Sequence, residues 1–161
     1  MRMQELSGKL DAQGKRFALI AGRFNNFISD RLIEGAVDCI VRHGGDEKNI
    51  TLIRVPGSFE IASALGAAVK SKRYDAVIAL GALIRGSTPH FDYIARALTS
   101  GVGEAAIAAQ GEVAVTFGVL TTDTVEQAIE RAGTKSGNKG FDAALAAIEM
   151  VNLLPQIRAG G

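Results

Sequence analysis

Cysteine and net charge are both scarce in this sequence, and each shortage excludes a class of protein. The single cysteine, Cys39, cannot form an intrachain disulfide, and its neighbours are not the ligands or cations of a metal site or a reactive thiolate. Eighteen Lys and Arg nearly balance 17 Asp and Glu, for a formal net charge of +1. The strong positive field of a nonspecific nucleic-acid or membrane-surface binder is therefore missing. We expect a reduced compartment, no nucleic-acid partner and no membrane partner.

Long hydrophobic runs are also missing. The longest, residues 76–84, is interrupted by Gly81 and is about half of the ~20 residues that a membrane-spanning helix needs. Residues 1–9 lack the apolar stretch of a secretory signal, so we expect a cytoplasmic protein. The chain has 161 residues, of which 47% are hydrophobic. This length suits one domain over residues 1–161.

Four short apolar runs alternate with segments of helical spacing. The runs cover residues 17–21, 50–55, 76–80 and 113–117, and each is typical of a strand buried on both faces. Apolar residues three and four apart predict helices between them, and two more helices near 123–132 and 138–154. This order predicts an α/β fold: a flavodoxin-like three-layer αβα sandwich with a four-stranded parallel sheet. Residues 1–14 show no period and are expected to form an N-terminal arm or an edge strand that extends a sheet.

Ligands of open parallel sheets bind beyond the carboxyl ends of the strands, here residues 21–26, 56–60, 81–90 and 117–123. In the third loop Gly86, Ser87 and Thr88 lead into a helix, where backbone amides attract an anion such as phosphate. His90 follows at once, and a neutral imidazole there can accept and return a proton. The alternative is that Thr88 only caps the helix and that His90 is an ordinary exposed residue.

Other residues of these loops have two interpretations each. Phe24 stands in a polar loop, where it either stacks on a flat ligand or plugs the core. Glu60 either accepts hydrogen bonds from substrate hydroxyls or stabilises the start of a helix. Arg131, Lys135 and Lys139 recur at four-residue intervals and either bind a phosphate or compensate helix charges.

Several common motifs are missing. No Gly-x-Gly-x-x-Gly follows the first predicted strand, and residues 133–139 have neither the spacing nor the preceding strand of a phosphate-binding P-loop. No Gly-x-Ser-x-Gly is present, and the two histidines lie too far apart in sequence to indicate a zinc site. These absences argue against dinucleotide binding, ATP binding, a nucleophilic serine of the Gly-x-Ser-x-Gly type and a zinc site.

Four blocks in order resemble the lumazine synthase family. They are VPGSFE (55–60), GALIRGSTPH (81–90), FGVLT (117–121) and EQAIERAGTKSGNKG (126–140), and the likeness extends over about residues 16–154. The resemblance implies that 5-amino-6-ribitylaminouracil condenses with 3,4-dihydroxy-2-butanone 4-phosphate to give 6,7-dimethyl-8-ribityllumazine, phosphate and water. This is the penultimate step of riboflavin biosynthesis, and it uses no metal and no organic cofactor.

The resemblance also implies a role for each loop. His90 is the catalytic proton shuttle, and Phe24 stacks on the pyrimidinedione. The remaining substrate-binding residues are Asn25, Ser58, Phe59, Glu60, Ala82, Leu83, Ile84, Phe117 and Lys139, and phosphate is held by Gly86, Ser87, Thr88 and Arg131. Phe117, Arg131 and Lys139 are expected to reach the site from a neighbouring subunit, so a monomer should be inactive.

The family forms homopentamers, and some members assemble twelve pentamers into a sixty-subunit icosahedral shell. The short linker at residues 133–137 resembles that of shell-forming members. One alternative function is a non-catalytic paralogue that binds flavin or lumazine or builds a shell. Another is an electron-transfer flavodoxin-like protein, but residues 23–26 are not the Ser/Thr-rich phosphate loop that it would need.

Overall fold

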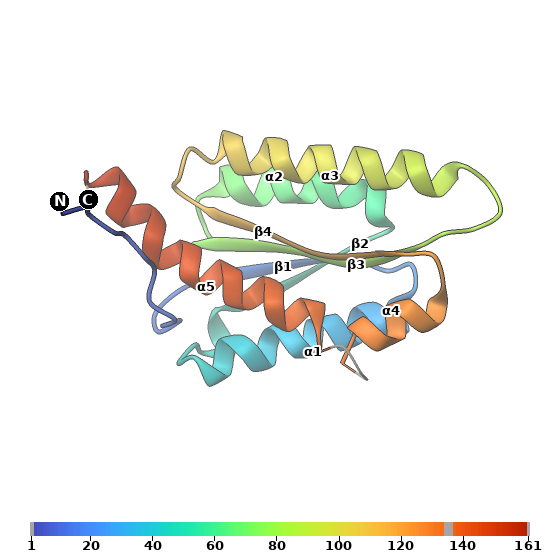
Figure 1. The fold of residues 1–161 in the computed structure, drawn as a ribbon, viewed down its shortest axis with the longest axis horizontal. Helices are drawn as coiled ribbons and strands as arrows, with labels where there is room; N and C mark the ends of the chain where they lie inside the picture. The colour runs from blue at the N-terminus through green and yellow to red at the C-terminus, as the bar shows by residue number, and fades with distance from the viewer. Residues whose placement is uncertain (1, 134–136, 161) are drawn as a thin grey trace.

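The computed structural model describes residues 2–133 and 137–160, and its strands form one four-stranded parallel sheet in the order β2-β1-β3-β4 (Figure 1). The strands are β1 (Phe17–Gly22), β2 (Ile50–Val55), β3 (Ala76–Ile84) and β4 (Ala114–Thr122). The helices are α1 (Asn26–Arg42), α2 (Ile61–Ser71), α3 (His90–Ala108), α4 (Val125–Arg131) and α5 (Lys139–Arg158), with 3₁₀ turns at Glu47–Asn49 and Ser58–Glu60. The predicted fold class is confirmed.

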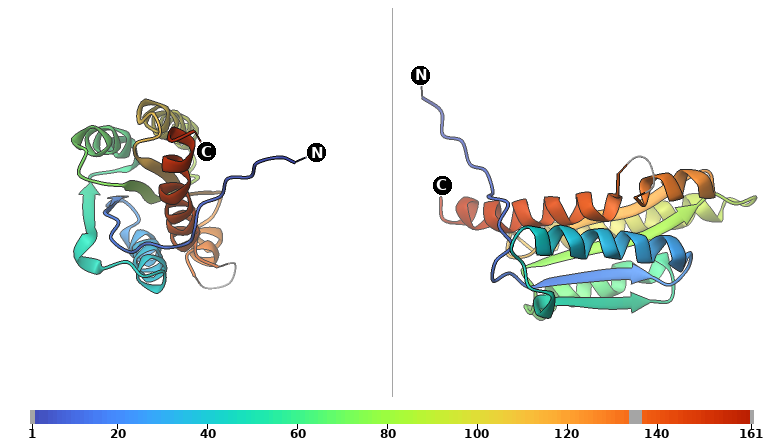
Figure 2. Two further views of the ribbon diagram at one scale, coloured as in Figure 1. Left: turned by 90° about the vertical axis from the view of Figure 1, so that its left-hand side faces the viewer. Right: turned by 90° about the horizontal axis from the view of Figure 1, so that it is seen from below.

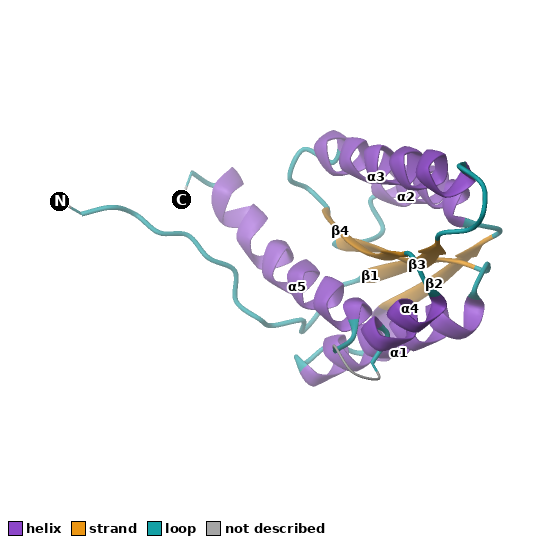
Figure 3. Ribbon diagram, turned by 45° about the vertical axis from the view of Figure 1, so that its right-hand side comes forward, coloured by secondary structure: helices purple, strands orange, loops and turns teal. Residues whose placement is uncertain are grey.

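Helices cover both faces of the sheet. α2 and α3 lie on one face, and α1, α4 and α5 lie on the other (Figures 1 and 3). Side chains alternate along a strand, so Phe17 and Leu19 of β1 pack toward α1 and α5, whereas Ala18 and Ile20 pack toward α2 and α3. β1 is buried along its whole length because it has a strand on each side and helices on each face.

The expectation that every strand is buried on both faces is wrong for β2. Thr51, Leu52 and Arg54 are exposed, and Leu52 has an exposed fraction of 41%. The reason is helix cover: among the described helices only α2 contacts β2 closely, whereas the other edge strand, β4, is covered by α3 on one face and by α4 and α5 on the other. An apolar run alone does not show whether helices cover both of its faces.

β3 and β4 are longer than predicted, because a glycine does not end either strand. Their pairing continues from Leu80↔Gly118 to Ile84↔Thr122, so residues 81–84 and 118–122 lie in strands and not in loops. A Cβ on Gly118 would approach the Leu80 side chain to 2.7 Å and the Ala143 side chain to 2.9 Å. Gly118 therefore permits close packing inside a strand.

The N-terminal arm lies along α5 from about residue 7, and its described residues do not pair with the sheet of their own chain (Figure 2). Asn152 Nδ2 donates to the carbonyl oxygens of Lys9 and Asp11 at 2.7 and 2.9 Å. Gln156 Nε2 donates to Ser7 O at 2.8 Å, and Ala12 is fully buried. The arm is thus fastened from residue 7 onward. Within the described part of the chain, no helix is long and apolar enough to cross a membrane.

Candidate active site

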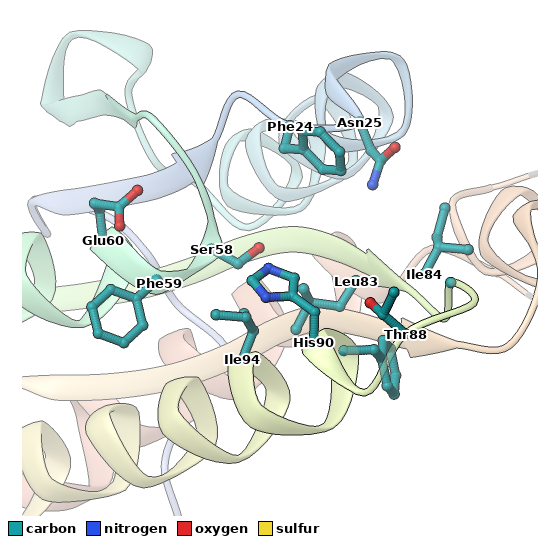
Figure 4. A pocket seen from close by; sticks show the side chains of 12 residues that line it. Phe24, Asn25, Ser58, Phe59, Glu60, Leu83, Ile84, Thr88, His90 and Ile94 are labelled. Carbon is teal, nitrogen blue, oxygen red and sulfur yellow. The ribbon is translucent and has the colours of Figure 1, made fainter.

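A pocket of about 470 Å³ opens at the carboxyl ends of β1, β2 and β3, beside the start of α3 (Figure 4). We call it the first pocket. Three chain segments build its walls: the turn after β1, the turn after β2, and the stretch from the end of β3 into α3. It is lined by Phe24, Asn25, Ser58, Phe59, Glu60, Leu83, Ile84, Gly86, Thr88, His90, Phe91 and Ile94.

The turn after β1 presents Phe24 and Asn25. Asn25 directly precedes α1 in the left-handed conformation, with φ 57° and ψ 44°, which Asn tolerates better than most residues. Its Nδ2 donates to the carbonyl oxygen of Ala82 in β3 at 3.2 Å. Phe24 is 71% exposed, so the interpretation that its ring plugs the core is wrong. The ring lies instead at the edge of the first pocket, free to receive a flat ligand.

The turn after β2 supplies a buried Ser58, an exposed Phe59 and a half-buried Glu60. These three form a 3₁₀ turn that continues directly into α2. Glu60 stands at the N-terminus of α2, where a carboxylate is electrostatically favoured, yet its side chain makes no capping hydrogen bond. Its oxygens are therefore not committed to the helix end and face the first pocket.

The third wall runs from β3 through residues 85–89 into α3. Leu83 and Ile84 end the strand half-buried, and Gly86 and Thr88 line the pocket beyond it. α3 begins at His90 with Pro89 as its N-cap, and the His90 ring points into the middle of the first pocket, toward Ser58 (Figure 4). An imidazole and the N-terminus of a helix thus share one cavity.

The remaining predicted residues line a different cavity, which we call the second pocket. It has a volume of about 410 Å³ and lies along β4, at the end of α4 and the start of α5. Phe117, Arg131 and Lys139 line it together with Val119, Leu120, Thr121 and Asp142. The two pockets share no lining residue, so within one chain Arg131 is not brought to the turn of Gly86 and Thr88.

Two predicted residues line neither pocket. Ala82 is buried and offers its carbonyl oxygen to Asn25, and Ser87 is exposed. Lys135, the middle member of the predicted cationic corner, lies outside the described residues. Among the described residues, no three His, Cys, Asp or Glu side chains are grouped so that they could hold a metal ion.

Sequence reasoning missed Phe91 and Ile94 as pocket residues. Both belong to the apolar spacing that predicted this helix, and Ile94 follows His90 by one helical turn and shares its face. Asp142 of the second pocket follows Lys139 by three residues on α5. For Ile94 and Asp142 the signal was helical spacing from a candidate site residue, and for Phe91 it was direct adjacency to His90.

Comparison with known proteins agrees with these motifs. A family model described as 6,7-dimethyl-8-ribityllumazine synthase matches residues 14–155. A protein of that name from Chlorobaculum parvum is 58% identical over 157 residues, covering 98% of this chain and 99% of the relative. The Aquifex aeolicus protein of the same name is 58% identical over 156 residues, covering 97% of this chain and 100% of the relative. The chain belongs to the 6,7-dimethyl-8-ribityllumazine synthase family.

Proposed function

We propose that the first pocket is where this chain condenses 5-amino-6-ribitylaminouracil with 3,4-dihydroxy-2-butanone 4-phosphate, giving 6,7-dimethyl-8-ribityllumazine, phosphate and water. The reaction follows from the family, because relatives of that name are 57–59% identical over nearly the whole chain. One observation supports this pocket as its site: an exposed aromatic ring, a free carboxylate, a helix N-terminus and a histidine line a single cavity. Its volume of about 470 Å³ lies in the range of small-molecule sites.

The pyrimidinedione binds in the part of the first pocket that is formed by the carboxyl ends of β1, β2 and β3. Its ring stacks on Phe24, and its polar edge meets the backbone of residues 82–84. Asn25, the backbone of Ser58 and Phe59, and the Glu60 carboxylate bind the ribityl chain and the ring to which it is attached. This assignment is supported by the exposure of Phe24 and by the uncommitted oxygens of Glu60.

The phosphate of the second substrate binds at Gly86, Ser87 and Thr88, where the N-terminus of α3 favours an anion. His90 then moves protons while the amine of the first substrate forms an imine, phosphate leaves and the ring closes. The imine nitrogen comes from the substrate, so no lysine Schiff base is needed. Bringing two reactants together supplies much of the rate, and proton transfer adds roughly 10²- to 10⁴-fold.

The site is completed by a second copy of the chain. In this proposal Phe117, Arg131 and Lys139 of one subunit face the first pocket of its neighbour in a homopentamer. Their separation from the first pocket within one chain supports this arrangement. The short linker at 133–137, whose residues 134–136 lie outside the described residues, favours further assembly into a sixty-subunit shell. A cytoplasmic location fits the lone, buried, reduced cysteine.

The test is the absorbance of the lumazine product after both substrates are mixed with purified protein. A mixture without protein is the control, because the condensation also proceeds uncatalysed. We expect clear acceleration, and we expect His90→Ala to slow the reaction by roughly 10²-fold without abolishing it. If a folded, assembled protein gave no acceleration, the result would contradict the enzyme and favour a non-catalytic flavin- or lumazine-binding protein.

A further inference from the structure

Arg85 holds three elements together just behind the first pocket. It follows β3 directly, and its backbone N–H donates to Thr122 O of β4 at 2.8 Å. Its Nε donates to Asp123 Oδ1 at 2.9 Å, and its Nη1 donates to the two carboxylate oxygens of Asp92 at 3.2 and 3.3 Å. The end of β3, the end of β4 and the first turn of α3 therefore meet at one guanidinium.

The same guanidinium lies over an aromatic ring of the first pocket. The Arg85 Cζ is 4.5 Å from the centroid of the Phe91 ring, a distance suited to a cation–π contact. Phe91 lines the first pocket and also a separate cavity of about 540 Å³, and Arg85 and Asp123 line only the latter. Arg85 thus supports Phe91 from outside the first pocket and does not line the cavity proposed for the substrates.

These contacts form a network. A single exposed ion pair contributes little to stability, whereas several charges with fixed geometry constrain one another. A guanidinium is planar and presents its N–H groups in fixed directions, so binding Asp123, Asp92 and the Phe91 ring together narrows the arrangements that their backbones can take. The hydrogen bond to Asp123 raises the pKa of Arg85 further, and the guanidinium stays charged at every pH at which the protein works.

We propose that Arg85 is a positioning residue, which fixes the turn of residues 86–89 and the first turn of α3 so that His90 keeps its place against the substrates. Arg85 immediately precedes this turn in the chain, and two of its partners, Phe91 and Asp92, immediately follow His90. The turn is therefore held at both of its ends by one side chain. This inference rests on the proposed role of His90.

The variants are Arg85→Met, which removes the guanidinium, and Arg85→Lys, which keeps the positive charge but not the planar set of N–H donors. Arg16→Met is the matched control. Arg16 also binds a carboxylate through two guanidinium nitrogens, on Asp75, but it lies at the amino ends of the strands, away from both pockets. Size-exclusion chromatography of all variants identifies any that no longer assemble, and in that case Asp92→Asn replaces Arg85→Met.

Two readouts separate positioning from a general structural role. The first is kcat of each variant in the wild-type and His90→Ala backgrounds. Because a small displacement of a catalytic group is costly, we expect Arg85→Met to lower kcat by about tenfold, Arg85→Lys to lower it by less, and Arg16→Met to leave it unchanged. In the His90→Ala background the Arg85→Met effect should shrink to about twofold or less, because the group that Arg85 positions is gone. An undiminished loss in that background would overturn the proposal.

The second readout does not depend on activity. Amide hydrogen exchange in a peptide spanning residues 85–92 should become several-fold faster in Arg85→Met and stay unchanged in Arg16→Met. An inactive wild-type protein would overturn the proposed function, and the exchange rates would still decide whether Arg85 holds the turn. Unchanged exchange, or faster exchange with an unchanged kcat in an active enzyme, would overturn the positioning role alone.

Discussion

The side chain of Asn25 ties the turn after β1 to the neighbouring strand β3, since its Nδ2 donates to Ala82 O at 3.2 Å. Asn25 also takes the left-handed conformation that turns the chain into α1. Phe24 precedes it in the chain, so both features orient the aromatic ring at the edge of the first pocket. One residue thereby combines a backbone role with a side-chain role, and substitution can separate the two.

Asn25→Gly keeps the backbone conformation but loses the hydrogen bond, whereas Asn25→Ala loses both. We expect the free energy of unfolding to fall by about 1 kcal/mol for Gly and by about 2 kcal/mol or more for Ala, because Ala is strained at positive φ. Denaturant titration measures both values. KM for the pyrimidinedione substrate should rise in both variants. Equal stabilities of the two variants would show that the positive φ contributes nothing.

The sequence predicted the strands and the loops at their carboxyl ends because each strand is a continuous apolar run. It did not predict where β3 and β4 end, since Gly81 and Gly118 resemble breakers and only the packing of Leu80 and Ala143 shows why a glycine is needed inside β4. It also did not predict that β2 is half exposed. The helices that cover a strand decide that property, and this cover is set by contacts between distant segments.

The candidate site was predicted in part. Phe24, Glu60 and His90 stand in loops that parallel topology brings together, and the structure gathers them in one pocket. The sequence could not show that Arg131 lines a different pocket, because only the folded chain places the end of α4 beside β4, the edge strand that β3 separates from β1. Arg85 belongs to the GALIRGSTPH block, but the sequence indicated no role for it, since its partners Asp92 and Asp123 meet only in the folded chain.

Asp75 makes stability depend on pH. Burial raises its pKa, but hydrogen bonds from the Arg16 side chain and backbone outweigh burial and hold the pKa below its ordinary value of 3.8. When the pKa is lower in the folded than in the unfolded protein, the carboxylate stabilises the fold fully at a pH above the unfolded-state pKa. This stabilisation is lost as the pH falls through the folded-state pKa. Asp75→Asn should therefore cost about 0.5–1 kcal/mol at pH 7, as expected for a partly exposed pair.

The cost of Asp75→Asn should disappear as the pH falls from about 5 to below the native pKa. Melting temperatures of both proteins across that range measure it. Asp38→Asn is the control, because the Asp38 pair with Arg42 lies on the exposed surface of α1. A cost that persists at the lowest pH would mean that shape or hydrogen bonding at Asp75, and not its charge, stabilises the fold.

Cys39 should be unreactive in the folded protein. Burial, followed by the nearby charge of Asp38, raises the pKa of its thiol to about 11, and the side chain is fully buried. Both effects suppress the thiolate that reacts with disulfide reagents. We expect no reaction with such a reagent at pH 8 under native conditions and one thiol per chain after unfolding. Rapid native reaction would show that the α1 layer opens readily.

Gly140 lies where α5 packs closely against the backbone of α1. An added Cβ would clash with the carbonyl oxygen of Leu32, and backbone cannot move aside as a flexible side chain can. Gly140→Ala should lower the free energy of unfolding by about 3 kcal/mol. Gly66→Ala on α2 is the control, because nothing lies within 4 Å of its added Cβ, and it should stabilise by about 0.5–1 kcal/mol. Denaturant titration that found Gly140→Ala neutral would contradict this packing.

Mixing two defective variants tests whether each site is shared between chains. His90→Ala damages the first pocket, and Arg131→Ala damages the second. If a site combines His90 of one chain with Arg131 of its neighbour, random one-to-one assemblies restore both residues in about one site in four. The mixture, unfolded and refolded together, should then approach a quarter of the wild-type rate and exceed either variant alone.

Phe24→Ala mixed with His90→Ala is the control. Both residues line the same pocket of one chain, so every first pocket in that mixture lacks one of the two side chains and mixing restores no site. A rate no higher than the average of the two separate variants would contradict sharing and leave Arg131 without a part in the first pocket.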